Sequence, residues 1–400
     1  MIALFFSPLY LFSTWLLAFM TNRWLKACSG KKVKTWIKVF IYLIFIVAAM
    51  AMPLGFILPG TSEVKYKLLH IGSIWLGVLM YSLFPALIYI VFCIIWRVYK
   101  RKKGTTGPLE RPRRIAITAA TVSILFVIII CTYGIFHATN TQITEYSIGV
   151  EKKNGKLDEI NAVMVADLHM GLNIGVNEME KMAALINECE PDIVFICGDI
   201  FDNIYDALDD PEKLIEIFKG IKTKYGIYAC YGNHDVDEKV LAGFTFNYSE
   251  KKVSDPRMDE FLSRAGINLL RDEYVLIDDS FYVYGRPDRS KPGRDIDDRK
   301  TPKELMASIP QGYPVIVLDH QPRQQDELAE NGCDVDLCGH THDGQIFPAN
   351  ILVSMLYENS YGYKKFGNMH NIVTSGVGLF GPYMRVGTRS EICNIKISFK

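Results

Sequence analysis

The chain has 400 residues, with 44 Lys plus Arg and 44 Asp plus Glu, so its formal net charge is zero. A balanced charge disfavours a strongly basic nucleic-acid-binding protein and an acidic tail protein. The charged residues are nevertheless unevenly distributed along the chain, because residues 1–137 hold 16 of the basic and two of the acidic side chains. The remaining 28 basic and 42 acidic side chains lie in residues 138–400. The sequence therefore predicts two domains, 1–137 and 138–400, with net charges of +14 and −14.

The first domain contains four apolar stretches, each about as long as a membrane-spanning helix. They are Ile2–Met20, Val39–Leu58, Ile71–Trp96 and Ile115–His137. Four such stretches in succession predict four transmembrane helices, with a buried soluble bundle as the minor alternative. No Lys or Arg precedes the first stretch, so we interpret it as a retained helix rather than a signal peptide.

The positions of the cations predict the orientation of these helices. Six Lys and Arg lie in residues 21–38 and eight in residues 97–114, whereas the second loop holds only Lys65 and Lys67. Short cytoplasmic loops carry an excess of Lys and Arg. We therefore expect a multi-pass cell-membrane protein whose residues 138–400 lie on the extracytoplasmic side. No charged residue lies deep in a stretch, which favours an anchor over a receptor or transporter bundle.

The second domain shows the alternation of strands and helices that is typical of an α/β fold. Strand-like runs occur at Ala162–Ala166, Ile193–Cys197, Gly226–Tyr231, Phe281–Tyr284, Val315–Leu318, Val335–Cys338, Asn371–Ser375 and Cys393–Phe399. Helix-start signals lie at Asn177, Asp210, Asp255 and Thr301. Asn154-Gly155 separates two strand-like segments, 142–152 and 157–166, and predicts a hairpin between them.

Five of the eight histidines follow directly after predicted strands, together with Asp or Asn. The five segments are Asp167-Leu168-His169, Gly198-Asp199-Ile200-Phe201-Asp202, Gly232-Asn233-His234-Asp235, Asp319-His320 and Gly339-His340-Thr341-His342. Ligands bind at the carboxyl ends of the strands in open α/β sheets. Imidazoles, carboxylates and an amide oxygen suit two divalent ions such as Mn, Fe, Zn or Co. Two ions about 3.5–4 Å apart can activate water and clamp the oxygens of a phosphoryl displacement.

These ordered motifs resemble the calcineurin-like metallophosphoesterase family over about residues 145–400. The resemblance implies an α/β (α+β) fold, a four-layer α/β/β/α sandwich that follows the four-helix region. The chain also resembles the bacterial membrane-anchored YkuE-like branch of this family. The matching residues are Gly339–Pro348, Ser375-Gly-Val-Gly, Arg385 and Glu391. That branch includes UDP-diacylglucosamine hydrolase-like enzymes and often has Gly where this chain has Asp343.

The resemblance also implies a role for each matching residue. The first metal would be bound by Asp167, His169 and His342, the second by Asn233, His320 and His340, with Asp199 bridging. His234 would be the general acid, oriented by Asp235, and Asp202 would hold a ligand histidine in its tautomer. Asn173, Arg286, Asp288 and Arg385 are candidates for contact with a substrate phosphate, with a structural ion pair as the alternative for each. Asp343, a carboxylate beside the metal ligands, bears on substrate preference. The three other histidines, His70, His137 and His370, have no motif around them and are interpreted as structural.

Together these features predict a membrane-anchored, two-metal phosphohydrolase in which a metal-bridging hydroxide attacks a phosphoester or pyrophosphate bond. The expected partners are the bilayer and a phosphorylated small molecule or a phospholipid or lipid-linked substrate, with no nucleic acid. Two alternatives stay open at this point. One is a transmembrane receptor or transporter regulated by a metal-binding domain, and the other is a cytosol-facing protein phosphatase.

Overall fold

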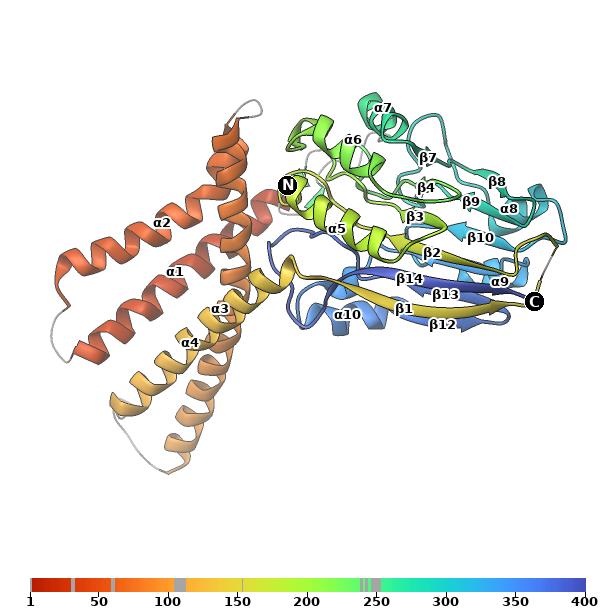
Figure 1. Cartoon of the computed structure of the whole chain (residues 1–400). Helices are drawn as coiled ribbons and strands as arrows, with labels where there is room; N and C mark the ends of the chain where they lie inside the picture. The colour runs from red at the N-terminus through yellow and green to blue at the C-terminus, as the bar shows by residue number, and fades with distance from the viewer. Residues whose placement is uncertain are drawn as a thin grey trace. The chain divides into compact units, whose positions relative to one another are not determined.

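The computed structural model describes residues 2–29, 33–58, 62–103, 113–152, 154–237, 240–241, 244–245 and 253–400 (Figure 1). The chain divides into two compact units. One comprises residues 1–135 with 382–384, and the other comprises residues 136–381 with 385–400.

The first unit is built from long helices. They are α1 (Ile2–Ser29), α2 (Thr35–Ile57), α3 (Glu63–Lys102) and α4 (Arg113–Ala138). Within the described residues, three helical segments are long and apolar enough to cross a membrane: Thr35–Ile57, Glu63–Lys102 and Ile117–Ala138. The expectation of four spans is thus corrected to three for the part of the chain that the structure describes. Helix α1 forms, but Asn22, Arg23 and Lys26 interrupt the apolar character of its second half.

Helices α2 and α3 approach each other closely at small residues. A Cβ atom added to Gly72 would lie 2.5 Å from the Cβ of Met52, and one added to Gly55 would lie 2.7 Å from the Cγ of Leu69. Small residues permit such close backbone contact between membrane helices. Helix α1 joins this pair through Tyr10, whose hydroxyl donates a 2.8 Å hydrogen bond to the carbonyl of Ala49.

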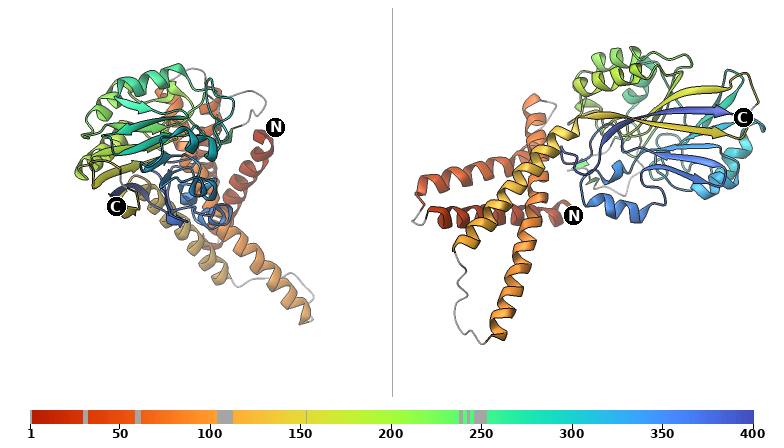
Figure 2. Two further views of the ribbon diagram at one scale, coloured as in Figure 1. Left: turned by 90° about the vertical axis from the view of Figure 1, so that its right-hand side faces the viewer. Right: turned by 60° about the horizontal axis from the view of Figure 1, so that its bottom comes forward.

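The second unit contains two six-stranded sheets (Figure 2). The first has the order β1 (Thr141–Val150), β14 (Ser390–Phe399), β2 (Glu159–Val165), β3 (Ile193–Cys197), β4 (Ile227–Cys230) and β7 (Ile267–Leu269). The second has the order β12 (Gly362–Phe366), β13 (Met369–Val373), β11 (Val335–Cys338), β10 (Val315–Leu318), β9 (Phe281–Gly285) and β8 (Glu273–Ile277). A separate pair joins β5 (Val240–Leu241) to β6 (Phe244–Thr245).

Both sheets are mixed, with parallel strands in their centres. Strands β2, β3, β4 and β7 are parallel, as are β9, β10, β11 and β13. Parallel pairing places the carboxyl ends of neighbouring strands at the same sheet edge. The predicted mixture of strands and helices is therefore confirmed, and it brings the motif-bearing loops to common edges.

The predicted hairpin between β1 and β2 is wrong. Strand β1 pairs in parallel with the C-terminal strand β14, which pairs in antiparallel register with β2. The last strand of the domain thus lies between two strands that are close in sequence. The turn signal at Asn154-Gly155 marks a reversal of the chain, but a local signal does not reveal that a strand about 240 residues away enters between its arms.

One hydrophobic core joins the inner faces of the two sheets. It includes Phe195 and Ile395 from the first sheet with Val283, Ile316 and Leu337 from the second, all fully buried. On the outer face of the second sheet, α8 (Pro302–Ser308) and α9 (Gln325–Glu330) pack in another cluster. Further helices are α5 (Val176–Glu188), α6 (Pro211–Lys219), α7 (Pro256–Arg264) and α10 (Ala349–Leu356), with 3-10 turns η1 (Tyr205–Ala207) and η2 (His342–Gly344). Helix α5 contacts β1 and β14 of the first sheet.

Three of the four predicted helix starts are confirmed. Asp210, Asp255 and Thr301 cap α6, α7 and α8, each followed by Pro in the first turn. The fourth helix, α5, begins at Val176, and the backbone N–H of its cap residue Gly175 donates to the Glu178 carboxylate at 3.1 Å. The predicted start at Asn177 was two residues late because glycine has no side-chain acceptor that would mark the cap.

Candidate metal centre

The chain turns sharply where the motif-bearing strands end. Five non-glycine residues there have positive φ angles: Asp167 (53°), His169 (46°), Asp199 (50°), His340 (72°) and His342 (51°). Such angles are uncommon outside glycine and often mark functional loops. Backbone hydrogen bonds fix the turns, since the N–H groups of Asp167 and His169 donate to the carbonyls of Gly198 and Asp199 at 2.9 and 3.0 Å. The side chains are consequently directed to common points beyond the sheet edge.

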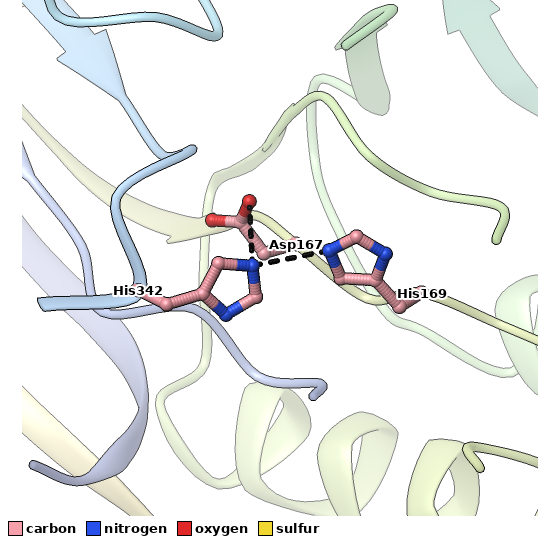
Figure 3. A group of neighbouring side chains, drawn as sticks. All are labelled: Asp167, His169 and His342. Carbon is pink, nitrogen blue, oxygen red and sulfur yellow. Dashed lines mark hydrogen bonds and ion pairs between the residues drawn. The ribbon is translucent and has the colours of Figure 1, made fainter. Parts of the chain in front are cut away.

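A first group of ligand-type side chains consists of Asp167, His169 and His342 (Figure 3). The Nε2 atoms of the two imidazoles lie 3.1 Å apart, and the Nε2 of His342 lies 3.4 Å from the Asp167 carboxylate. All three side chains are buried. A buried carboxylate and two imidazoles that face one another are an arrangement suited to a bound cation, which would accept all three lone pairs.

A second group consists of Asp199, His320 and His340. The Nε2 of His320 lies 3.1 Å from the Asp199 carboxylate and 3.2 Å from the side-chain oxygen of Asn233. His320 donates its Nδ1 proton to the carbonyl of Cys197 at 3.0 Å, which leaves Nε2 free to act as a ligand. Asp199 connects the two groups, because the same carboxylate oxygen is 3.7 Å from the Nε2 of His169.

The electrostatics of the imidazoles differ within each group. Burial opposes it, but Asp202 beside His169 and Asp199 beside His320 raise the pKa of these two imidazoles above its ordinary value. Burial, and then the proximity of His320, lower the pKa of His340 to about 4, so that its imidazole is neutral at pH 7. Burial and the adjacent His169 likewise lower the pKa of His342 well below its ordinary value. Neutral imidazoles retain the lone pair that a metal requires. Burial raises the pKa of Asp167 to about 6, a cost that a bound dication would remove.

His234 lies beside the first group, with its ring centroid 4.9 Å from that of His169. Its Nδ1 donates to the side-chain oxygen of Asn203 at 2.5 Å and lies 3.6 Å from the Asp202 carboxylate. The predicted partner Asp235 accepts instead from the backbone N–H groups of Phe201 and Gly232, at 2.8 and 2.7 Å. Asp235 therefore braces the loops after β3 and β4, and Asn203, which the sequence did not indicate, contacts the imidazole.

Asp202 lies between two histidines, 3.7 Å from the Nδ1 of His169 and 3.6 Å from that of His234. Burial alone would raise its pKa, but hydrogen bonding to His169 and His234 outweighs burial and lowers the pKa below its ordinary value. An ionised carboxylate at this place favours the tautomer of His169 that keeps Nε2 unprotonated.

Two candidate phosphate-binding arginines are fully buried and already paired. Arg286 donates to the Asp319 carboxylate at 2.6 Å, and Arg299 donates to the other oxygen of the same carboxylate at 2.8 Å. Arg385 donates to the backbone carbonyls of Ser375, Gly376 and Gly378. The guanidinium groups of Arg286 and Arg385 are thus bound to other groups of the protein interior. They are placed to hold neighbouring segments and are not exposed.

The other sequence candidates surround these groups less closely. Asp288 is buried and accepts from the N–H groups of Ser290 and Lys291 and from the side chain of Gln321. Asp343 is half-buried next to His342, and burial raises its pKa to about 6. Asn173 donates a long hydrogen bond to the carbonyl of Gly381.

Phe380 forms an apolar wall that the sequence did not indicate. Its ring centroid lies 5.5 Å from that of His234 and 6.2 Å from those of His169 and His342. Gln345 fixes the loop, since its side chain accepts from the N–H of Phe380 at 2.7 Å and donates to its carbonyl at 2.8 Å. A single phenylalanine in a glycine-rich loop carries no sequence signal for such a position.

Comparisons with known proteins agree with this chemistry. The family model for calcineurin-like phosphoesterases matches residues 160–344. A transmembrane protein with a metallophosphoesterase domain from Danio rerio is 26% identical over 341 residues, which cover 80% of this chain and 73% of the relative. An uncharacterized metallophosphoesterase from Campylobacter jejuni is 26% identical over 339 residues, covering 83% and 84%. The phosphodiesterase YaeI of Escherichia coli is 25% identical over 251 residues, covering 59% and 81%.

Proposed function

Since these matches support a calcineurin-like metallophosphoesterase domain and a hydrolase that acts on phosphoester bonds, we propose that the chain is a membrane-anchored phosphohydrolase with two metals. The observation that carries the two-metal proposal is the position of Asp199 between two groups of ligand-type side chains. The YkuE-like branch and the four-layer α/β/β/α arrangement belong to this proposal, and the core shared by both sheets supports the latter.

We assign the ligands as the geometry and the motifs suggest. Asp167, His169 and His342 would hold the first metal, Asn233, His320 and His340 the second, and Asp199 would contribute to both. When bound, two divalent ions of Mn, Fe, Zn or Co would neutralise phosphate charge and make water nucleophilic at neutral pH. The identity of the ions stays part of the proposal.

The chain's own residues complete the chemistry. His234 is within reach of the same centre, and its Nδ1 is committed to Asn203, so Nε2 is the atom that can give a proton to a leaving oxygen. Asp202 supports both His234 and His169. Phe380 covers one side of the imidazoles and excludes water there.

We further propose that the active site is extracytoplasmic and that the substrate is a phosphoester or pyrophosphate, soluble or lipid-linked. The basic loops support this side of the membrane, and the similarity to the E. coli phosphodiesterase supports a phosphodiester substrate. A panel of phosphomonoesters, phosphodiesters and lipid pyrophosphates, assayed with Mn, Zn and Fe, would identify the substrate class.

The ligand assignment is tested by Asp199→Asn and Asn233→Ala in the full-length chain. We expect each to lower metal-dependent turnover of an aryl phosphodiester by about 10²-fold or more, because both side chains would contact bound metal. The matched control is Asp279→Asn, which changes a largely exposed carboxylate paired only loosely with Lys156. Metal content is measured on the same samples. Wild-type turnover and metal content in both ligand variants would refute the assignment.

A further inference from the structure

Helix α10 presents an apolar face that no other part of its own unit buries. Ile351, Leu352, Met355 and Leu356 are 50%, 62%, 78% and 66% exposed. None of the eight residues of α10 is buried. The stretch from residue 344 to residue 357 also contains no charged side chain. Positions 351, 352, 355 and 356 lie along one side of a helix, so they form one contiguous apolar patch. Soluble proteins rarely leave such patches uncovered.

Both ends of α10 adjoin segments that carry candidate metal ligands. At its start, Gly344 follows His342 in η2 and packs so closely on Asn350 that a Cβ atom would clash with the Asn350 nitrogen. At its end, the ring of Tyr357 lies 6.0 Å from that of His340. The apolar face is therefore attached to the rim of the candidate metal centre.

A cation borders the apolar face at its C-terminal end. The guanidinium carbon of Arg323 lies 4.1 Å from the centre of the Tyr357 ring, and its Nη1 donates to the carbonyl of Leu356 at 3.3 Å. An apolar helical face edged by tyrosine and arginine is the composition found where proteins meet lipid head groups. Arginine there can pair with lipid phosphates.

We propose that α10 lies in the interfacial layer of the bilayer, with its four apolar side chains among the upper acyl segments and Arg323 at the phosphates. The short connection between α4 and β1 supports a bilayer contact at this face. Helix α4 ends at Ala138 and β1 begins at Thr141, so only two residues connect a candidate span to the domain. Such a short connection holds the domain at the bilayer surface. On the function proposed above, this contact brings the metal centre to the level of lipid phosphate groups.

The contact is tested by photo-crosslinking of the full-length chain in vesicles of phosphatidylcholine and phosphatidylglycerol. The photoreactive residue p-benzoylphenylalanine replaces Leu352, or, as the matched control, Tyr274, which is 41% exposed on β8. We expect lipid adducts by mass spectrometry at position 352 and far fewer at position 274. Adducts at position 352 that join residues 1–137 or a second copy, or the absence of any lipid adduct there, would overturn the proposal. This readout does not depend on catalysis.

A second measurement links the contact to substrate use. In the double variant Leu352→Ser/Met355→Ser, we expect the ratio of lipid-phosphate turnover in vesicles to soluble aryl-phosphodiester turnover to fall several-fold. Tyr274→Ser is the control, for which the ratio should not change. Equal losses on both substrates would show that the face serves the fold instead. A wild-type chain that hydrolyses neither substrate would refute the proposed function. The crosslinking result would then test the contact between α10 and the bilayer by itself.

Discussion

The residues of the candidate metal centre have backbone conformations that other parts of the protein maintain. Asp167, His169, Asp199, His340 and His342 all have positive φ angles, each of which costs on the order of 1 kcal/mol for a residue with a Cβ atom. Such angles persist only where surrounding contacts hold the loops.

Two buried side chains supply those contacts. The carboxylate of Asp235 accepts from the N–H groups of Phe201 and Gly232, in the loops after β3 and β4. The guanidinium of Arg385 donates to the carbonyls of a loop in which Gly376 packs directly on Asp167. Asp235 and Arg385 therefore contribute by holding the loops from which the ligand-type side chains project.

Asn203 is the residue that we expect to orient His234. Because its side-chain oxygen accepts the Nδ1 proton at 2.5 Å, Asn203→Ala should leave the imidazole free to rotate and to change tautomer. We predict a fall in kcat of about tenfold to a hundredfold with little change in KM, and a shifted basic limb in the pH profile of kcat.

Asn203→Asp is the informative companion variant, because it keeps an acceptor at the same position. It should restore most of kcat, and because its carboxylate adds a negative charge beside the imidazole, the basic limb of the profile should move to higher pH. If Asn203→Ala lowered kcat without altering the pH profile, and Asn203→Asp failed to rescue it, Asn203 would be only structural. Melting temperatures of both variants identify any loss of fold.

The residue types of the centre were predictable because the motifs lie directly after strands, but their contacts were not. Asp235 follows His234 in sequence and was therefore expected to orient it. Adjacent residues in a tight turn point in different directions, and Asn203, 31 positions earlier, occupies the place beside the imidazole. Phe380 likewise reaches the centre through a loop whose position depends on Gln345 and not on a local pattern.

At the scale of helices and strands, the helix starts could be predicted from local sequence, whereas the pairing of distant strands could not. Helices α6, α7 and α8 begin where an acceptor side chain precedes Pro, since cap and first turn are fixed within four residues. The pairing of β1 with β14 joins residues about 250 positions apart, and no local pattern specifies it. The predicted hairpin failed for this reason.

His370 connects the two sheets and makes their association pH-dependent. Its Nε2 donates to the carbonyl of Gly149 in β1 at 3.0 Å, and its Nδ1 accepts from the hydroxyl of Tyr363 in β12 at 3.0 Å. Burial lowers the pKa of His370 below its ordinary value, so the folded state favours the neutral imidazole. The unfolded chain then binds the extra proton first, and stability falls as the pH drops below about 6.5.

We predict that His370→Gln lowers the melting temperature of the full-length chain at pH 7.5, because glutamine can replace only the bond to Gly149. The difference in melting temperature between variant and wild type should become smaller at pH 5.5. Only the wild type has this imidazole, and keeping it unprotonated in the folded state costs stability at that pH. The measurement is thermal unfolding in detergent with a chelator present, so that metal binding does not contribute. A difference that stays constant or grows as the pH falls would contradict the prediction.

At the scale of the whole molecule, the balanced charge is the sum of two terms with separate causes. The +14 of residues 1–137 comes mostly from two short loops, whereas the −14 of residues 138–400 includes Asp167 and Asp199, which would be metal ligands. Two dications would leave the domain negative, so bulk attraction cannot recruit an anionic substrate. Metal charge at the centre would have to bind the phosphate locally.

The basic loops also make the predicted side of the membrane independent of α1. If α2 starts in the cytoplasm after the first basic loop, α3 returns there to the second, and α4 leaves again, residues 139–400 are extracytoplasmic whether or not α1 spans. We therefore predict that alkaline phosphatase fused after Lys400 is active and that a green fluorescent protein at the same place is dark. Fusions after Lys103, in the second basic loop, are the matched control and should show the opposite pattern, because that loop is expected to face the cytoplasm. Fluorescence after Lys400 with inactive alkaline phosphatase would place the metal centre in the cytosol and favour a signalling phosphatase, since substrates on the outer surface would then be inaccessible to it.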